Sequence, residues 1–154
     1  MSEFSAIAVQ TVNPGESVVF TANPVPCKRG FVRWRDESPN FLLSGNMGNR
    51  CACYCASKSA KYHVDFGANI AVPTGETVGP ISVAIAVDGT TLPESTMIST
   101  PAAVEEFNAV SKAATIDIWR GCCQTVTVRN TSSIPILVQN AVINFSRPDL
   151  AVSY

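Results

Sequence analysis

The sequence has little charge, one histidine and no long apolar run. Only 15% of its 154 residues are charged, well below the usual quarter. The 11 Lys and Arg nearly balance the 12 Asp and Glu, so electrostatics gives no case for nucleic-acid binding. No stretch approaches the roughly 20 apolar residues that span a bilayer. The start, "MSEFSAIAVQ", lacks the basic and apolar regions of a secretion signal. We therefore expect a soluble protein, made in the cytoplasm, that inserts into no membrane.

Residue patterns that would support catalysis are also scarce. His63 lies near Asp65, but no nucleophile motif accompanies the pair. The glycines between positions 67 and 89 follow no phosphate-loop spacing. Glu105 and Glu106 are adjacent, which does not suit a glycosidase pair facing a sugar from two sides. The sequence predicts no enzyme, no catalytic residue and no cofactor.

The cysteines form the most unusual local pattern, because the stretch "RCACYC" places three of six at alternate positions. In a strand, Cys51 and Cys55 would lie about 13 Å apart, too far to share a metal whose sulfur ligands lie just under ~4 Å from one another. A bridge between alternate residues of one strand is strained, although a cross-strand disulfide from Cys27 to one of the three stays open. We favour small packed or interface-lining residues and predict no metal site. A metal-binding or redox protein remains a hypothesis for the thiol cluster, which comprises Cys27, Cys51, Cys53, Cys55, Cys122 and Cys123.

Alternation of apolar and polar residues recurs along the chain and predicts half-buried β-strands. In "KYHVDF", for example, Tyr62, Val64 and Phe66 share one face, opposite Lys61, His63 and Asp65. The predicted core residues are Val18, Phe20, Ile81, Val83, Ile85, Val126, Val128, Ile143 and Phe145. In "ILVQNAVINF" the pattern is expected to place one more set on a single face, consisting of Leu137, Ala141, Ile143 and Phe145.

Turn-forming segments such as "NPGE", "PTGETVGP" and "RNTSS" separate these runs. About eight to ten strands in one domain of this length predict an all-β fold, an antiparallel β-sandwich or jelly roll. The segment "TPAAVEEFNAVSKA" allows one short helix or an extended or loop path, and we favour the extended or loop path. The expected organisation is a single domain over 1–154, with short tails at 1–5 and 148–154.

Two long segments carry a family resemblance. These are "VDFGANIAVPTGETVGPISVAIAVDGTTLPESTMISTPAAVEEFN" and "RGCCQTVTVRNTSSIPILVQNAVINFSRP". They resemble small virion structural proteins of tailed phages and prophages of gut Firmicutes. The second half is also similar to the tumour necrosis factor-like jelly rolls at the tips of bacterial collagen-like and spore-surface proteins.

The resemblance implies a homotrimeric jelly roll on the virion surface, made in the host cytoplasm, that acts as a capsid decoration or head-fibre protein. Its partners would be copies of itself and the phage major capsid protein or another virion protein. The alternative is a fibre-tip or surface-filament jelly roll that binds a host surface glycan or protein. Candidate trimer contacts, chosen for size and apolar character, are Tyr62, Phe66, Phe107 and Trp119. Candidate capsid or partner contacts are Arg33, Trp34, Arg35, Arg50, Lys58 and Lys61.

Overall fold

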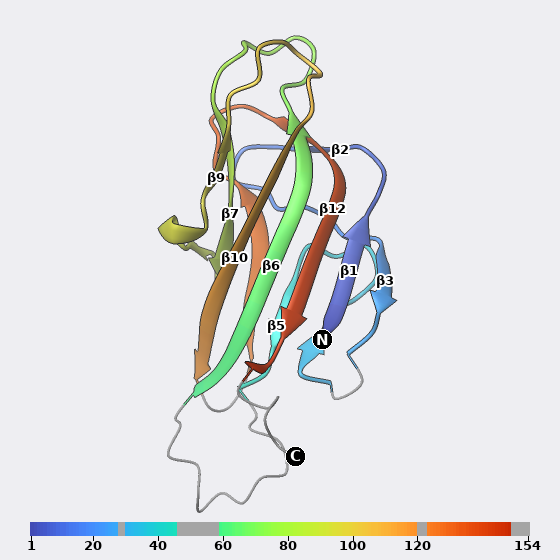
Figure 1. Ribbon diagram of the computed structural model, residues 1–154, viewed down its shortest axis with the longest axis vertical. Helices are drawn as coiled ribbons and strands as arrows, with labels where there is room; N and C mark the ends of the chain where they lie inside the picture. The colour runs from blue at the N-terminus through green and yellow to red at the C-terminus, as the bar shows by residue number, and fades with distance from the viewer. Residues whose placement is uncertain (28–29, 46–58, 120–122, 149–154) are drawn as a thin grey trace, which may run out of the picture.

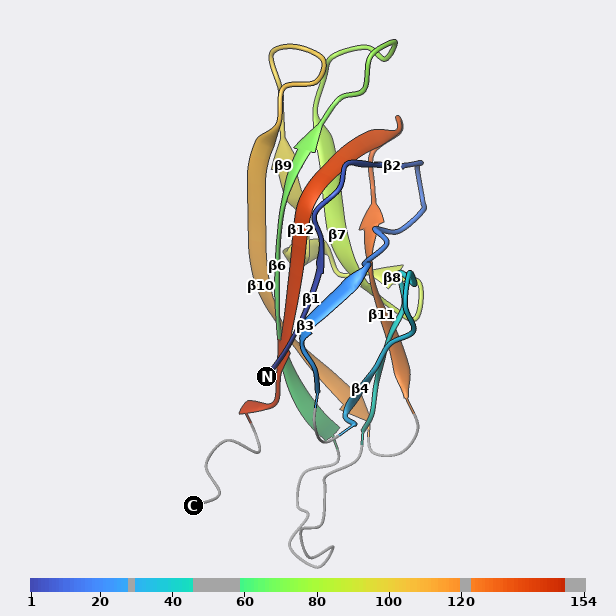
Figure 2. The same ribbon diagram turned by 90° about the vertical axis from the view of Figure 1, so that its right-hand side faces the viewer.

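The alternating segments of the sequence become strands of two facing sheets, which we call A and B (Figures 1 and 2). The computed structural model describes residues 1–27, 30–45, 59–119 and 123–148. Sheet A has the strand order β10 (Asn108–Trp119), β6 (Ser59–Ala71), β12 (Ile136–Ser146), β1 (Ser2–Ala6) and β3 (Ala22–Val25), with β2 (Gln10–Val12) paired to β12. Sheet B has the order β4 (Val32–Arg33), β5 (Phe41–Leu43), β11 (Gln124–Asn130), β7 (Ile81–Val87) and β8 (Thr90–Thr91), with β9 (Met97–Ser99) paired to β7.

Three long antiparallel strands, β6, β10 and β12, lie side by side in sheet A (Figure 1). The pairing of β6 with β10 is unbroken from Ser59 opposite Trp119 to Ile70 opposite Asn108. Because the register does not slip, every second residue of both strands points to the same side of the sheet. The predicted antiparallel β-sandwich is confirmed.

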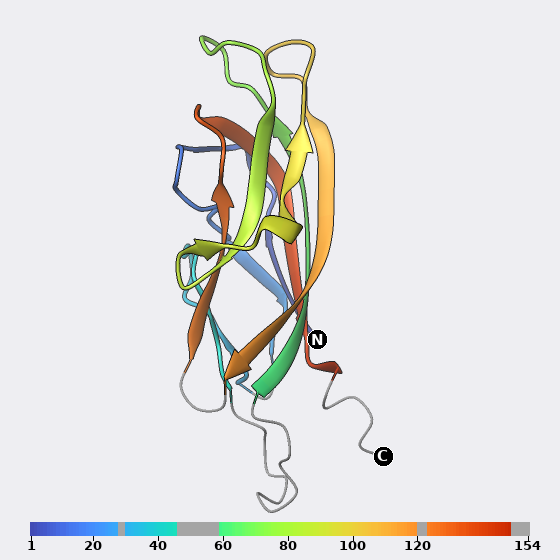
Figure 3. The ribbon, with the colours of Figure 1, turned by 90° about the vertical axis from the view of Figure 1, so that its left-hand side faces the viewer.

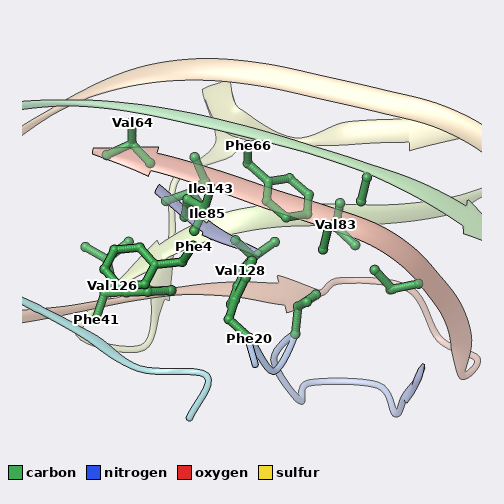
Figure 4. Packing of buried hydrophobic residues seen from close by; sticks show 14 of the residues in the cluster. Phe4, Phe20, Phe41, Val64, Phe66, Val83, Ile85, Val126, Val128 and Ile143 are labelled. Carbon is green, nitrogen blue, oxygen red and sulfur yellow. The ribbon is translucent and has the colours of Figure 1, made fainter. Parts of the chain in front are cut away.

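Apolar side chains from both sheets meet in one core (Figure 4). At its centre the ring of Phe41 lies 4.7 Å from that of Phe4, 5.2 Å from Phe20 and 5.0 Å from Phe145, measured between centroids. Such tilted aromatic contacts add to the stabilisation from burying apolar area. All nine predicted core residues are buried, with at most 1% of their surface exposed.

A β-bulge in β12 corrects one expectation of strict alternation. The pairing of β12 with β6 shifts between Gln139 and Val142, and Asn140 there has a left-handed φ of 53°. The extra residue reverses the inward direction, so Ile136 and Val138 are buried on the N-terminal side of the bulge and Leu137 is partly exposed. The prediction that Leu137 shares the face of Ile143 and Phe145 is therefore wrong.

The predicted N-terminal tail over 1–5 is also wrong. Ser2–Ala6 forms β1, which pairs with β12 and β3 and buries the Phe4 ring in the core. Residue 148 is described, whereas the rest of the predicted C-terminal tail, 149–154, lies outside the described residues.

The favoured path of the segment from Pro101 is confirmed, because residues 101–107 contain no helix and β10 begins at Asn108. A short 3-10 turn, η2 (Pro93–Ser95), lies between β8 and β9. Within the described ranges, no helix is long and apolar enough to cross a membrane.

Asn130, at the end of β11, is a buried amide that ties several chain segments together. Only 1% of its surface is exposed, and its Nδ2 donates to the carbonyls of Val12 and Ile134, both at 2.9 Å. Its Oδ1 accepts a hydrogen bond from the Ser132 amide at 2.8 Å. All of these partners belong to the backbone, so the amide fixes the turn between β11 and β12 against β2.

We expect Asn130→Ala to lower the free energy of unfolding by about 2–4 kcal/mol, since it leaves several buried backbone groups unpaired. Denaturant unfolding measures this loss. The matched control is Asn13→Ala, at an exposed position whose amide meets only the Glu16 carboxylate at 3.3 Å. Equal and small losses for both variants would contradict the role assigned to Asn130.

Candidate functional site

The outward side of sheet A forms a long, regular surface. It consists of the odd-numbered residues 109–119 of β10, the odd-numbered residues 59–69 of β6, the even-numbered residues 142–146 of β12, and Glu3 and Ser5 of β1. We call this surface the A face. The strand register aligns these residues in rows across the sheet, for example Ser111, Gly67, Val142 and Ser5.

Small side chains make the part of the A face around Gly67 and Ser111 flat. Along β10 the outward residues from Ala109 to Thr115 are alternately alanine or a small hydroxyl residue, and all four are exposed. Ala109 and Ser111 lie opposite Asn69 and Gly67 of β6, and the next two lie opposite Asp65 and His63. A flat surface of small residues lets another backbone approach closely, whereas long charged side chains would hold it away.

Gly67 is the least expected residue of this surface. It lies within β6, where glycine weakens a strand and often marks a place at which another backbone approaches. A Cβ added there would lie 3.8 Å from its nearest neighbours, the Ser111 Cβ and the Val110 carbonyl oxygen. That is ordinary van der Waals contact, and Gly67 does not have a left-handed φ. Nothing in the single chain therefore requires glycine at this position.

The part of the A face toward the Ser59 end of β6 carries paired charges. Lys61 Nζ lies 2.9 Å from Asp117 Oδ1, with both side chains more than half exposed. His63 Nε2 lies 3.4 Å from Asp65 Oδ1 on the same strand, as expected for two residues on one face of a strand. Asn144 lies between Asp65 and Glu3 in the next row. Its side-chain oxygen is out of contact with solvent and has no hydrogen-bond partner among the described residues.

The free edge of sheet A adds a second unusual surface. In β10 three consecutive residues, Ser111 to Ala113, are exposed, so neither side of the strand is covered at that point. Ile98 of β9, in the other sheet, is 68% exposed. Figure 3 shows β10 (orange) along one side of the molecule next to β9 (yellow). An open strand edge can pair with another strand, and burying the exposed isoleucine would be favourable.

Solved structures share this arrangement of strands. The globular domain of zebrafish complement 1qA matches with a TM-score of 0.63 and 12% identity, over 96% of this chain and 95% of that one. Eiger tumour necrosis factor from S. frugiperda matches with a TM-score of 0.63 and 11% identity, over 99% and 93%. Murine APRIL matches with a TM-score of 0.55 and 11% identity, over 93% and 98%.

The fold is the jelly roll of tumour necrosis factor and complement 1q domains. The match extends over nearly the whole chain, so the fold prediction is confirmed. No protein-family model and no curated protein sequence matches the chain.

Two of the predicted trimer contacts belong instead to the core of the jelly roll. Tyr62 and Phe66 have at most 2% of their surface exposed. The Tyr62 hydroxyl can donate to either of two backbone carbonyl oxygens, that of Ser44 at 2.6 Å or that of Phe31 at 3.1 Å. Both rings point inward because they alternate with the outward Lys61 and Asp65, so neither can reach another copy. The alternation in the sequence already indicates that both residues are buried, since they share the face of Val64.

The other two candidates remain accessible. Trp119 is 67% exposed and lies on the A face at the end of β10, opposite Ser59. Phe107 is partly exposed, immediately before β10 begins. Their contact with another copy stays a prediction.

The predicted partner contacts differ in how far they are exposed and in what they contact. Arg33 and Arg35 are exposed, and Lys61 is paired with Asp117 on the A face. Trp34 is partly buried, with its ring 5.3 Å from that of Phe4 and its Nε1 donating to the Ser38 carbonyl at 2.9 Å. The indole thus covers the edge of the core. Arg50 and Lys58 lie outside the described residues.

Four cysteines of the proposed thiol cluster lie outside the described residues, namely Cys51, Cys53, Cys55 and Cys122. Cys27 and Cys123 are partly buried. In the described part of the chain, no group of three or more His, Cys, Asp or Glu side chains is arranged to hold a metal ion.

Proposed function

We propose that the protein is a non-enzymatic structural protein that forms a homotrimer through the A face and attaches to a virion surface as a capsid decoration or head-fibre protein. The observation that carries this proposal is the glycine at position 67, which the fold of the single chain does not require. It lies within a flat surface of small residues. Its jelly-roll fold supports the assembly, and the sequence resemblance of the two long segments supports the virion setting.

The structure favours packing of the β10 edge of one copy onto the A face of the next. The edge presents Ile98 and the exposed side of β10, whereas the face presents Gly67 and Val142. Because these two surfaces differ, each copy contacts one neighbour through its β10 edge and the other neighbour through its A face. Such head-to-tail contacts form a closed ring when the rotation that relates neighbouring copies returns to the first copy. Closure after three copies would cover both the open edge and the flat face of every subunit.

Attachment to a capsid would use residues that the ring leaves exposed. Arg33 belongs to β4, at the edge of sheet B, and Arg35 follows it. Neither has an ion pair among the described residues, where the pairs are Lys61 with Asp117 and His63 with Asp65. These guanidinium groups suit carboxylates on a capsid protein, which they can hold with two hydrogen bonds each. Three copies in one ring would multiply such contacts through effective concentration.

Native mass spectrometry of the protein, purified under reducing conditions, tests the assembly. We expect a metal-free species of three times the 16.4 kDa chain mass. Ala113→Arg, which places a long charged side chain on the A face, should give monomers. Thr127→Arg, on the outward side of β11 in sheet B, is the matched control and should remain trimeric. A monomeric wild-type protein, or a monomer that carries zinc, would contradict the proposal.

A second candidate function is a trimeric fibre tip that binds a host glycan. The observation that favours it is Trp119, whose 67% exposed indole has the flat apolar surface on which sugar rings stack. Cosedimentation with purified capsids that lack the protein, together with a glycan array, separates the two functions. Binding to capsids without glycan binding favours decoration, and the opposite result favours the fibre tip.

A further inference from the structure

We propose that assembly of the protein is linked to proton uptake at His63, so that the copies associate more tightly as the pH falls from neutral toward 5.5. This inference rests on the proposed homotrimer and adds a regulation of the same surface. His63 is the chain's one histidine, and it lies on the A face. Histidine is the side chain whose charge ordinarily changes in this pH range.

The strand register defines which groups surround His63 on the A face. On β6 its neighbours are Lys61 and Asp65, and across the sheet it is opposite Thr115 of β10 and Ser146 of β12. The other charged groups on this part of the face are Asp117 of β10, which pairs with Lys61 at 2.9 Å, and Glu3 of β1. Because Lys61 already has a carboxylate partner, Asp65 and Glu3 have no second lysine or arginine on the A face to balance them. Lys112 of β10 is exposed at the edge but lies opposite Phe66, on the other side of the sheet.

The row next to His63 is rich in hydrogen-bond acceptors. Asp65, Asn144 and Glu3 follow one another across three strands, and the Asn144 side-chain oxygen has no donor within reach among the described residues. Only the Asn144 amide nitrogen can donate from these side chains. The row therefore holds two carboxylates and an unsatisfied amide oxygen, with the His63 imidazole 3.4 Å from the Asp65 carboxylate.

Covering the A face with another copy removes the water that solvates these carboxylates. Burial of an unbalanced carboxylate is unfavourable, whereas a paired charge loses less on burial. A protonated His63 supplies the missing positive charge beside Asp65. The assembled state thus binds this proton more strongly than the separate chain does, and by linkage a lower pH favours assembly.

Sedimentation equilibrium at pH 7.5 and pH 5.5 tests the linkage on the intact chain. We expect the wild-type concentration at half-assembly to be roughly fivefold to a hundredfold lower at pH 5.5, the usual range of coupling between two binding events. His63→Gln keeps a polar side chain that cannot be charged, and its half-assembly concentration should be the same at both pH values. Asp65→Asn removes the carboxylate beside His63 and leaves Glu3 in place, so this variant should assemble more tightly than the wild type at pH 7.5 and should gain less when the pH falls to 5.5.

The results separate this inference from the homotrimer itself. A wild-type protein that assembles equally at both pH values would overturn the proton linkage and leave the homotrimer standing. The linkage would also be overturned if His63→Gln kept the pH dependence of the wild type. A wild-type protein that stays monomeric at both pH values and at all concentrations would overturn the homotrimer, and the linkage with it. Far-UV circular dichroism confirms that each variant is folded at both pH values.

Discussion

Gly67→Val is expected to dissociate the assembly and leave the individual chain folded. Within the chain the new Cβ has room, because its nearest neighbours lie at 3.8 Å, and a β-branched residue suits the middle of a strand better than glycine does. Between copies, the extra methyl groups would overfill a close contact at a cost of about 1–3 kcal/mol for each interface. Three interfaces in a closed ring would raise the half-assembly concentration by roughly tenfold to over a hundredfold.

The matched control is Gly79→Val, at a glycine in the 72–80 loop. No atom lies within 4 Å of a Cβ built at Gly79, and its φ is not left-handed, so this variant should assemble as the wild type does. Size-exclusion chromatography with light scattering over a range of concentrations measures both variants. Retention of the wild-type mass by Gly67→Val at every concentration would place the contact elsewhere.

Phe41→Ala is expected to cause the largest loss of stability among single core changes. The Phe41 ring, from sheet B, is fully buried and contacts the rings of Phe4, Phe20 and Phe145, which come from sheet A and from the segment before β3. Its removal leaves a cavity at the junction of these elements, with an expected cost of about 3–5 kcal/mol. For a chain of this length, that corresponds to a fall in Tm of about 6–20 °C.

Leu42→Ala is the control for Phe41→Ala, because it alters the next residue of the same strand. Leu42 points outward and is 39% exposed, so its truncation should shift Tm by no more than about 2–4 °C. Thermal unfolding at one fixed protein concentration keeps any contribution of assembly the same for the three proteins. Similar shifts for the two variants would show that the aromatic cluster is not the centre of the core.

The strands and the core could be predicted from sequence because alternation is a local property. Val126 and Val128, or Ile81 and Val83, need no knowledge of their partners to be assigned to the inward face. The failure at Leu137 arises from the bulge at Asn140, since one added residue reverses the faces on one side of it. A bulge depends on the neighbouring strand, which the sequence of β12 alone does not reveal.

The candidate surface could be predicted only in part. His63 and Asp65 share a face, as their spacing indicates. The size of Tyr62 and Phe66 suggests an interface, whereas their alternation with Lys61 and Asp65, on the face of Val64, indicates burial. The rows of the A face require the strand order and register, which join residues 5, 67, 111 and 142 from distant parts of the chain. Large aromatic residues are the usual signal of an interface, whereas this surface is distinguished by small residues and a glycine.

Photo-crosslinking from the A face tests the central claim most directly. Benzoylphenylalanine at Ser111, on the exposed edge of β10, should crosslink wild-type copies into covalent dimers and trimers, and the same probe at Thr127 in sheet B should yield monomers. Mass spectrometry of the crosslinked peptides should then identify the neighbouring chain's residues around Gly67 and Val142. Crosslinking from Thr127 but not from Ser111 would show that the copies meet through sheet B, and would contradict the role of the A face.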